Sequence, residues 1–487
     1  MLLVEIFLII FVGLVIVMLL RALPTKPRKV EISSAESITV DPQIAIQHLA
    51  GAVRIKTASH LDANQIDYPA FLDLHRYLEV SFPLVHQTLQ REIVAQYSLL
   101  YTWPGQDNHL KPALLMGHLD VVPIEEGTDK DWVCPPFEGR VQNGYLWGRG
   151  TMDDKNAVIG VLEAVESLLR EGYQPKRTIY LAFGHDEEIG GTGAAQIAAL
   201  FQSRGIKLES VLDEGLAIIN GILPGVKKPF ALIGVAEKGY LSVELNVESS
   251  GGHAAMPPRE TAIGILSKAM VRLEQNQMPA HFKPPTSLMF AYLAPEMPFL
   301  LRVVLRNLWL FRGLLINRLV TVNTVNAMVR TTTAPTIFSS GFKDNILPIQ
   351  ARGAVNFRLL QGDTVEKVLK HVQETIADRR VKIIPASDFC VEASPVSNVD
   401  SMSFHALERA LLRTFPGVVI APGLVTGATD SRHYTKLTDS VYRFSPLWIK
   451  SEDLSRVHGT NERIGVDDFH KMVQFYAEFI RELSLGG

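Results

Sequence analysis

Residues 178–193 read TIYLAFGHDEEIGGTG, and this stretch decides the fold. Its first six residues form a short apolar run with the composition of a buried strand. An acidic, glycine-containing loop follows, and residues 193–204 are predicted to form a helix that ends at Gly205. A strand that leads through a polar loop into a helix is the repeating unit of an α/β domain with a mainly parallel sheet.

The same unit recurs elsewhere in the chain. Residues 113–116 form another short apolar run. Apolar side chains then repeat at helical spacing between Val158 and Leu169, and Gly172 ends that helix. After about residue 385 the alternation of helix and strand patterns resumes and ends in an amphipathic helix.

The pattern is different between residues 236 and 385. Residues 240–247 alternate like a strand with one exposed face, and two helical patterns and further strands follow. We therefore predict a small inserted α+β domain at residues 236–385, within an α/β domain that consists of residues 41–235 and 386–487.

An uncharged apolar segment, residues 6–20, lies near the N-terminus. A helix of twenty residues is about 30 Å long, roughly the thickness of the bilayer core. Basic residues follow the segment and only Glu5 precedes it, the reverse of the order in a cleaved signal peptide. We predict a single-pass membrane anchor at residues 1–22 and a linker at 23–40. The positive-inside rule favours a cytoplasmic catalytic domain, but the side of the membrane stays open, as do a cleaved signal with secretion and a buried core helix.

The composition excludes several classes of protein. Of 487 residues, 47% are hydrophobic and 20% are charged, which is typical of a large core and not of a disordered chain. The formal net charge is −3 and there is no basic tract, so no nucleic-acid partner is expected. Two cysteines, Cys134 and Cys390, are too few for a disulfide framework or a cysteine zinc site.

A second apolar stretch, residues 300–320, contains four arginines, so a further membrane span is not predicted. It is compatible with an amphipathic helix packed on the insert. It is also compatible with a wall for an apolar substrate or with contact to a membrane surface.

Acidic residues and histidines gather where the predicted strands end. His118 and Asp120 follow the run 113–116, and residues two apart in an extended chain point the same way. Asp153 and Asp154 precede a predicted helix, where one carboxylate would cap the helix and two adjacent ones repel. Each pair also has an ordinary structural explanation, as a hydrogen-bonded histidine or as a helix cap.

Three more motifs repeat this theme: DEE at 186–188, LDEG at 212–215 and HGTNE at 458–462. Adjacent carboxylates at a buried strand end are costly unless something positive binds there. Carboxylates and imidazoles together are the ligands of a pair of divalent ions, and the imidazoles favour zinc. Two Zn²⁺ ions are balanced in charge by three carboxylates and one hydroxide.

In order and spacing, these motifs resemble those of the aminoacylase / carboxypeptidase S family of two-zinc metallopeptidases, peptidase family M20. The resemblance covers residues 40–485 and rests on HLD, GRGTMDDK, GHDEEIGGTG, LDEG, GGHAAMP and HGTNE. RTTTAPTIF and GATDSRHY are most similar to the N-fatty-acyl-amino-acid synthase/hydrolase branch. The family implies a zinc-exopeptidase-like catalytic α/β domain, an inserted α+β domain of the lid or dimerisation type, and a possible homodimer.

The resemblance also implies a ligand for each position of a two-zinc centre. His118 and Asp213 would hold one ion, Glu188 and His458 the other, and Asp153 would bridge them. Relatives often carry glutamate at the ligand position of the LDEG motif. Here Asp213 takes the motif position and Glu214 follows it.

The catalytic residues implied by the family are Asp120, Glu187 and His253. Asp120 would orient the imidazole of His118, and Glu187, which adjoins a ligand, would be the general base. His253 would reach the site and stabilise the oxyanion. As an alternative, His253 is only a turn residue.

The substrate carboxylate would be bound by Asn345, Arg358 and Arg432. A guanidinium presents a fork of donors that matches a carboxylate. As an alternative, Arg358 is an exposed residue on a strand.

The sequence thus predicts a zinc-dependent hydrolase of N-acyl amino acids, most similar to enzymes with fatty-acyl substrates, with condensation as the reverse reaction. A carboxypeptidase or dipeptidase acting on peptides with a free carboxyl end is the alternative enzyme. A membrane-anchored binding protein with an inactive site is the rival from another class, but an inactive site should have lost ligands, and here every position is filled.

Overall fold

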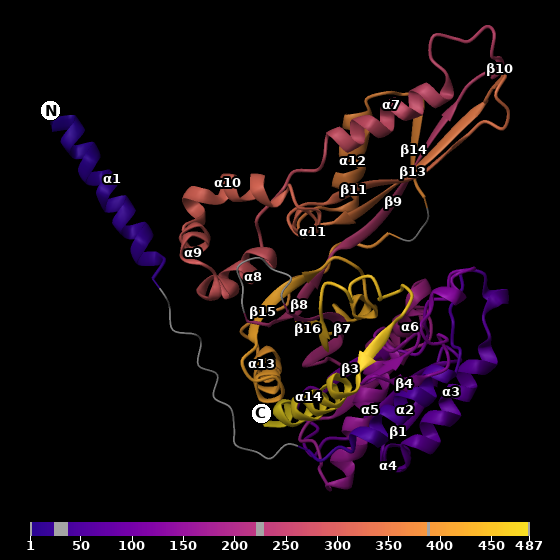
Figure 1. Ribbon diagram of the computed structural model, residues 1–487, viewed down its shortest axis with the longest axis vertical. Helices are drawn as coiled ribbons and strands as arrows, with labels where there is room; N and C mark the ends of the chain where they lie inside the picture. The colour runs from indigo at the N-terminus through magenta and orange to yellow at the C-terminus, as the bar shows by residue number, and fades with distance from the viewer. Residues whose placement is uncertain (1, 24–37, 221–227, 387–389, 486–487) are drawn as a thin grey trace.

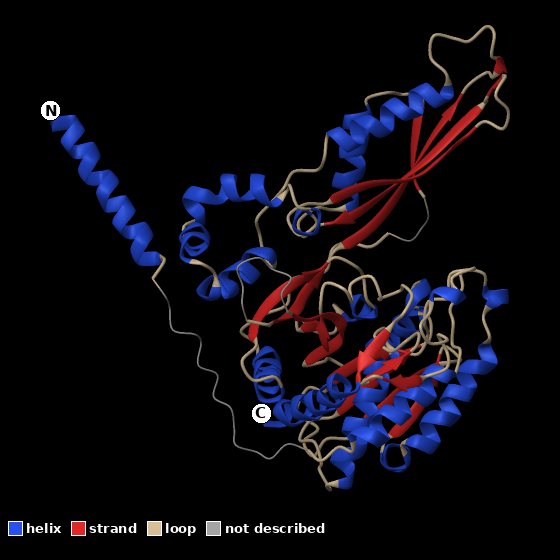
Figure 2. Ribbon diagram, in the orientation of Figure 1, coloured by secondary structure: helices blue, strands red, loops and turns tan. Residues whose placement is uncertain are grey.

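The computed structural model describes residues 2–23, 38–220, 228–386 and 390–485. Within these ranges the chain forms a large sheet and a smaller sheet, each covered by helices, and a separate N-terminal helix (Figures 1 and 2). The chain leaves the large sheet, builds the smaller one and then returns. The predicted α/β sheet is therefore present together with a second sheet. The division into a catalytic domain and an inserted lid domain at residues 236–385 stays a prediction.

The large sheet has eight strands in the order β1-β2-β6-β3-β7-β16-β8-β15. Strands β6, β3, β7 and β16 pair in parallel, whereas the β1–β2 hairpin and the β16–β8 pairing are antiparallel. The prediction of a mainly parallel sheet therefore holds for the centre, and the whole sheet is mixed. The strands are β1 (Gln90–Val94), β2 (Ser98–Trp103), β3 (Ala113–His118), β6 (Ile179–Gly184), β7 (Ser210–Ile219), β8 (Phe230–Glu237), β15 (Val419–Val425) and β16 (Val441–Ile449).

Helices cover both faces of the large sheet because its strands present apolar side chains on both sides. In β2, Leu99 and Tyr101 join one buried cluster and Leu100 joins the other. The second cluster is closed by α6 (Thr192–Ser203). The first is closed by α2 (Pro42–Arg54), α3 (Tyr68–Ser81), α4 (Pro83–Thr88), α5 (Lys155–Arg170), α13 (Met402–Thr414) and α14 (Val466–Leu485).

The smaller sheet is antiparallel, in the order β11-β13-β9-β14. Strand β8 ends at Glu237 in the large sheet and β9 begins at Gly239 in the smaller one, so the chain crosses between them at Lys238, close to the predicted boundary. The strands of the smaller sheet are β9 (Gly239–Glu248), β11 (Thr332–Ser340), β13 (Gln350–Leu359) and β14 (Val381–Pro385). The helices α7 (Ala262–Gln275) and α12 (Val365–Ile376) cover it.

The remaining described strands form two small sheets. One pairs β10 (Gly252–His253) with β12 (Ile346–Leu347) at the far end of the smaller sheet (Figure 1). The other has the order β17-β5-β4, with β4 (Arg140–Gln142), β5 (Tyr145–Trp147) and β17 (Arg463–Gly465).

Three of the helices between β9 and β11 pack on the edge of the large sheet. Their buried residues, among them Met289 and Leu315, join a cluster with Phe230 of β8 and Ala421 of β15. The stretch 300–320 is therefore two helices on the edge of the large sheet, and the interpretation that it packs on the insert is wrong. The three helices are α8 (Thr286–Leu293), α9 (Phe299–Arg306) and α10 (Leu308–Leu319). The short helix α11 (Asn323–Asn326) follows them and contains no buried residue.

The N-terminal helix α1 (Leu2–Arg21) contains no buried residue and projects from the body of the protein (Figure 1). Among the described residues it is the one helix long and apolar enough to cross a membrane. A signal sequence has the same length and composition, so the membrane anchor stays a proposal.

Candidate metal centre and active site

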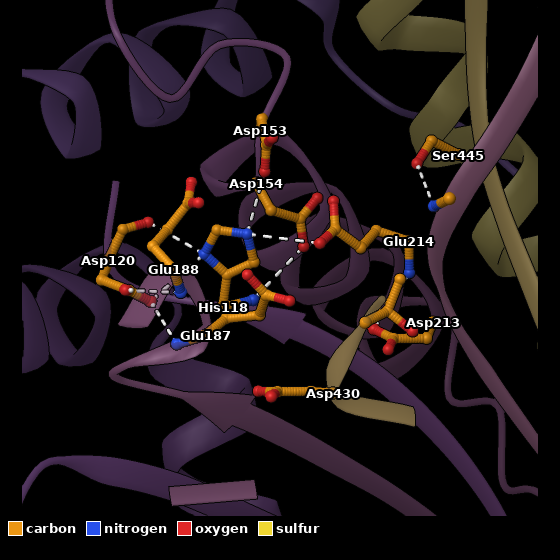
Figure 3. Close-up of polar contacts among 12 residues, drawn as sticks. His118, Asp120, Asp153, Asp154, Glu187, Glu188, Asp213, Glu214, Asp430 and Ser445 are labelled. Atoms are coloured by element: carbon orange, nitrogen blue, oxygen red, sulfur yellow. Dashed lines mark hydrogen bonds and ion pairs between the residues drawn. The ribbon is translucent and has the colours of Figure 1, made fainter. Parts of the chain in front are cut away.

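Three neighbouring parallel strands bring their acidic loops to one edge of the large sheet. Strand β3 ends at His118, which lies opposite Gly184, the last residue of β6. The pairing of β3 with β7 ends at Leu212, directly before Asp213. The residues that follow β3 and β6 therefore meet Asp213 and Glu214 of β7 at this edge, as Figure 3 shows.

Asp153 lies at the middle of the resulting cluster. Its Oδ1 is 2.9 Å from Nε2 of His118, and its Oδ2 is 2.9 Å from Nε2 of His458. Glu188 approaches the same His458 nitrogen at 3.4 Å. The adjacent carboxylate of Asp154 instead accepts the backbone N–H of His118 at 3.2 Å, so only one acid of the pair faces the imidazoles.

Two groups of three side chains have geometry suited to a metal ion, and they share Asp153. In each group the donor atoms lie within 4.8 Å of one another. The first group is His118, Asp153 and Glu214; the second is Asp153, Glu188 and His458. Four of the five predicted ligands are thus brought together.

The fifth predicted ligand, Asp213, lies outside both groups. Successive side chains of a strand point to opposite faces, so only one member of the Asp213–Glu214 pair can face the cluster. Oε1 of Glu214 lies 3.4 Å from Nε2 of His118. Asp213 is buried, and it accepts the backbone N–H of Ser431 at 2.8 Å. The geometry therefore favours Glu214 as the ligand where the sequence predicted Asp213.

The charges of the cluster fit a pair of divalent cations. Burial, and then the negative charge of Asp153, raise the pKa of Glu214 to about 8, which shows how unfavourable the gathered carboxylates are for one another. Carboxylate oxygens and imidazole nitrogens suit zinc, and three protein ligands for each ion leave a position for water or substrate. The residues present therefore fit the metals that the motifs imply.

Asp120 holds His118, Glu187 and Glu188 in place through hydrogen bonds. It is fully buried, and its carboxylate accepts the hydroxyl of Ser59 at 2.6 Å and the backbone N–H groups of Glu187 and Glu188 at 3.2 Å each. The backbone oxygen of Asp120 lies 2.9 Å from Nδ1 of His118, and its Oδ1 lies 3.2 Å from the same atom. With Nδ1 engaged in this way, Nε2 of the imidazole is directed to the cluster.

Glu187 stands beside a proposed ligand but belongs to neither metal group. It begins the short helical turn η3 (Glu187–Ile189) after β6. Burial raises the pKa of the Glu187 carboxyl well above its usual value, and the negative charges of Asp430 and Glu214 add to the rise. A carboxyl with a raised pKa next to a metal site suits the transfer of protons.

Arg432, predicted to bind substrate, instead supports the loop of Glu187. It lies in the turn η5 (Asp430–Tyr434), and its guanidinium donates to the backbone oxygens of Gly190 at 2.7 Å and Thr429 at 2.8 Å. Asp430 lies in the same turn, close to Gly191, where an added Cβ would come within 1.9 Å of Oδ1. The second glycine of the motif is therefore required by this close approach.

Glu462 is a buried carboxylate that sequence reasoning did not assign. Its Oε1 accepts the backbone N–H groups of Gly150 at 3.0 Å, Met152 at 2.7 Å and Asp153 at 3.3 Å. Its Oε2 is 2.6 Å from the guanidinium of Arg149. Glu462, the last residue of HGTNE, thus fixes the loop that carries Asp153. In the sequence, this contact was indicated only by the opposite charges of Glu462 in HGTNE and Arg149 in GRGTMDDK.

Replacing Glu462 with alanine is expected to lower the free energy of unfolding by about 3–5 kcal/mol, because Arg149 would be left as an unpaired buried charge. Chemical denaturation of the purified protein measures the change. Glu92→Ala is the matched control, because it removes an ion pair of equal length to Arg204 in which the side chains are 41% and 38% exposed. Equal effects of the two substitutions would contradict this role of Glu462.

The remaining predicted residues lie outside the cluster, on the smaller sheet or at its far end. His253 is exposed on β10, and Asn345 lies beside it, with its backbone oxygen accepting the N–H of Ala254 at 3.1 Å. Arg358 lies on β13 opposite Tyr240, near the crossing between the sheets, and stacks on that ring at 4.8 Å. Arg358 is half-buried. Strand β10, which carries His253, lies at the far end of the smaller sheet (Figure 1), and Asn345 directly precedes its partner strand β12.

Known proteins are similar in sequence to this chain over nearly its whole length. The chain is 43% identical over 485 residues to an N-fatty-acyl-amino acid synthase/hydrolase of Xenopus tropicalis, with 98% of this chain and 94% of that protein covered. It is 42% identical over 481 residues to a carboxypeptidase S-like protein of Dictyostelium discoideum, with 96% and 92% covered.

The fold is also found in solved structures. The crystal structure of a metallo-carboxypeptidase from Sulfolobus solfataricus superimposes with a TM-score of 0.67 at 18% identity, covering 91% of this chain and 99% of that one. Residues 114–482 match the family described as Peptidase family M20/M25/M40. These residues include the whole cluster around Asp153, and the chain therefore belongs to peptidase family M20/M25/M40.

Proposed function

We propose that this protein is a two-zinc hydrolase that cleaves the amide bond of N-fatty-acyl amino acids and catalyses the reverse condensation at the same site. The observation that carries the proposal is the pair of ligand groups that share Asp153. The substrate class is supported by the 43% identity with an N-fatty-acyl-amino acid synthase/hydrolase.

The ions would be held by the two groups that share Asp153, and when bound they supply the positive charge that acidifies water and polarises a carbonyl. Glu187 takes a proton from the attacking water and passes it to the leaving nitrogen. The C–N bond breaks, the acyl carbon gains the water oxygen, and the amino acid departs with its own carboxylate unchanged. In condensation Glu187 moves the proton in the opposite direction.

We assign the substrate carboxylate to Arg358. Stacking on Tyr240 fixes the guanidinium plane, and burial lowers the pKa of Arg358, so a carboxylate would find a partly desolvated cation. His253 lies on β10 and Asn345 directly precedes β12, so these residues could serve the site only through rotation of the smaller sheet or from a second copy of the chain. Mixing the His253→Ala and Glu187→Gln proteins restores activity only in the second case.

The proposal predicts that kcat/KM rises with acyl length from acetyl to about palmitoyl or oleoyl. Each buried methylene contributes about 0.8 kcal/mol, so roughly ten extra carbons add several kcal/mol of binding even after ordering losses. Arg358→Ala is expected to lower kcat/KM about equally for every chain length, because the carboxylate is common to all. The measurement is amine release from a series of N-acyl phenylalanines.

A carboxypeptidase that acts on small peptides is the second candidate. It is favoured by the 42% identity with a carboxypeptidase S-like protein, and both candidates require a free carboxylate. Faster cleavage of dipeptides or acetyl amino acids than of fatty-acyl amino acids in the same series would establish it and defeat the first proposal.

We further propose that α1 is retained as a membrane anchor. Its length and its lack of buried residues support this assignment.

A further inference from the structure

Among the described residues, a polar contact near the C-terminal end of α1 joins this helix to the rest of the protein. Nδ2 of Asn307 donates to the backbone oxygen of Met18 at 3.1 Å and to that of Val303 at 2.8 Å. Asn307 is fully buried and joins α9 to α10, and Ala22 at the end of α1 is buried as well. The junction of α9 and α10 is therefore docked on the end of α1.

This contact sets the depth of α9 and α10 if α1 crosses a bilayer. Met18 precedes the charged Arg21 by three residues. At the helical rise of about 1.5 Å per residue this is roughly 4–5 Å, so Met18 would lie just inside the level of the lipid headgroups. Asn307 contacts it there, which places the two helices at the boundary of headgroups and acyl chains, the usual depth of interfacial amphipathic helices.

The side chains that α9 and α10 expose suit this position. Leu300 is 78% exposed and Leu314 is 70% exposed, although inward-facing residues of the same helices are buried on the large sheet. The exposed apolar patch consists of Phe299, Leu300, Leu301, Trp309, Leu310 and Leu314. Residues 299–320 also contain four arginines and no acidic residue, a composition that matches an anionic lipid surface.

We propose that α9 and α10 lie in the surface of a lipid bilayer next to the anchor α1. This inference rests on the proposed anchor and not on the proposed chemistry. It gives the catalytic domain a second membrane contact, so that the body of the enzyme is held against the bilayer. A substrate with a fatty-acyl chain dissolves in that bilayer, and the edge of the large sheet that carries β8 and β15 faces it.

Trp309 provides a natural probe of this contact. It is 56% exposed, whereas Trp103, Trp132 and Trp147 are buried. The full-length protein is reconstituted into vesicles of phosphatidylcholine and phosphatidylserine whose acyl chains carry bromine, which quenches tryptophan only at close range. We expect quenching of the wild type, and much less quenching of Trp309→Phe. Trp448→Phe is the matched control, because Trp448 packs against Phe415 in the large domain, and it should be quenched like the wild type.

A second variant distinguishes membrane binding through α1 from contact of α9 and α10 with the bilayer surface. Leu300→Glu with Leu314→Glu changes only exposed positions, so it should still sediment with vesicles through α1 but lose most of the quenching at Trp309. Wild-type protein that does not sediment with vesicles would overturn the anchor and this inference, and leave the proposed reaction untouched. Protein that sediments while Trp309 remains open to aqueous iodide would overturn the inference alone. Shielding from iodide without quenching by lipid bromine would assign the patch to a second copy of the chain and overturn it too.

Discussion

Replacing Glu187 with glutamine is expected to lower kcat by at least about 10²-fold, the lower end of the range for general acid–base catalysis. The amide cannot take a proton from water, yet it fills the same space. Because Glu187 belongs to neither ligand group, both metals should stay bound. Steady-state kinetics and elemental analysis of the same preparation measure the two quantities.

Glu188→Gln is the matched comparison, because it changes the neighbouring residue of the same turn and removes a proposed ligand. This variant should lose metal as well as activity. Near-normal turnover by Glu187→Gln would assign the general base to another carboxyl group, with Asp120 as the next candidate.

The second large effect is expected at Glu214. Glu214→Gln should lose one metal and most of the activity, because the geometry makes this carboxylate the partner of His118 and Asp153. Asp213→Asn should keep both metals, because Asp213 accepts backbone N–H groups of Ser431 and Glu214. Its activity should fall by no more than about 10–100-fold, as for residues that support a ligand without binding the metal.

Metal content and kcat/KM of the two variants decide between these adjacent residues. Loss of metal in Asp213→Asn, together with full occupancy in Glu214→Gln, would restore the ligand set predicted from the sequence and reject the one taken from the structure.

The sequence predicted most of the cluster because strand ends are visible as patterns. His118, Glu188 and their neighbours follow apolar runs, and parallel strands end at a common edge. The choice between Asp213 and Glu214 was not predictable in this way. It depends on which face of β7 each residue occupies, and a shift of one residue exchanges the faces.

Contacts between distant segments were also hidden in the sequence. Glu462 lies more than 300 positions from Arg149, and nothing local connects them. The apolar stretch at 300–320 lies within the sequence predicted as the insert but packs on the edge of the large sheet, where Phe230 and Ala421 supply its apolar partners. The motif around His253 indicated a functional residue, but its place at the end of the smaller sheet follows from the tertiary arrangement.

The metal content of the active wild-type protein tests the central claim most directly. The two ligand groups predict two zinc ions for each chain, because each group has three donors and Asp153 serves both. A chelator should remove the ions and abolish hydrolysis of an N-fatty-acyl amino acid, and added zinc should restore it. Fully active protein that contains no more than trace metal would contradict the claim.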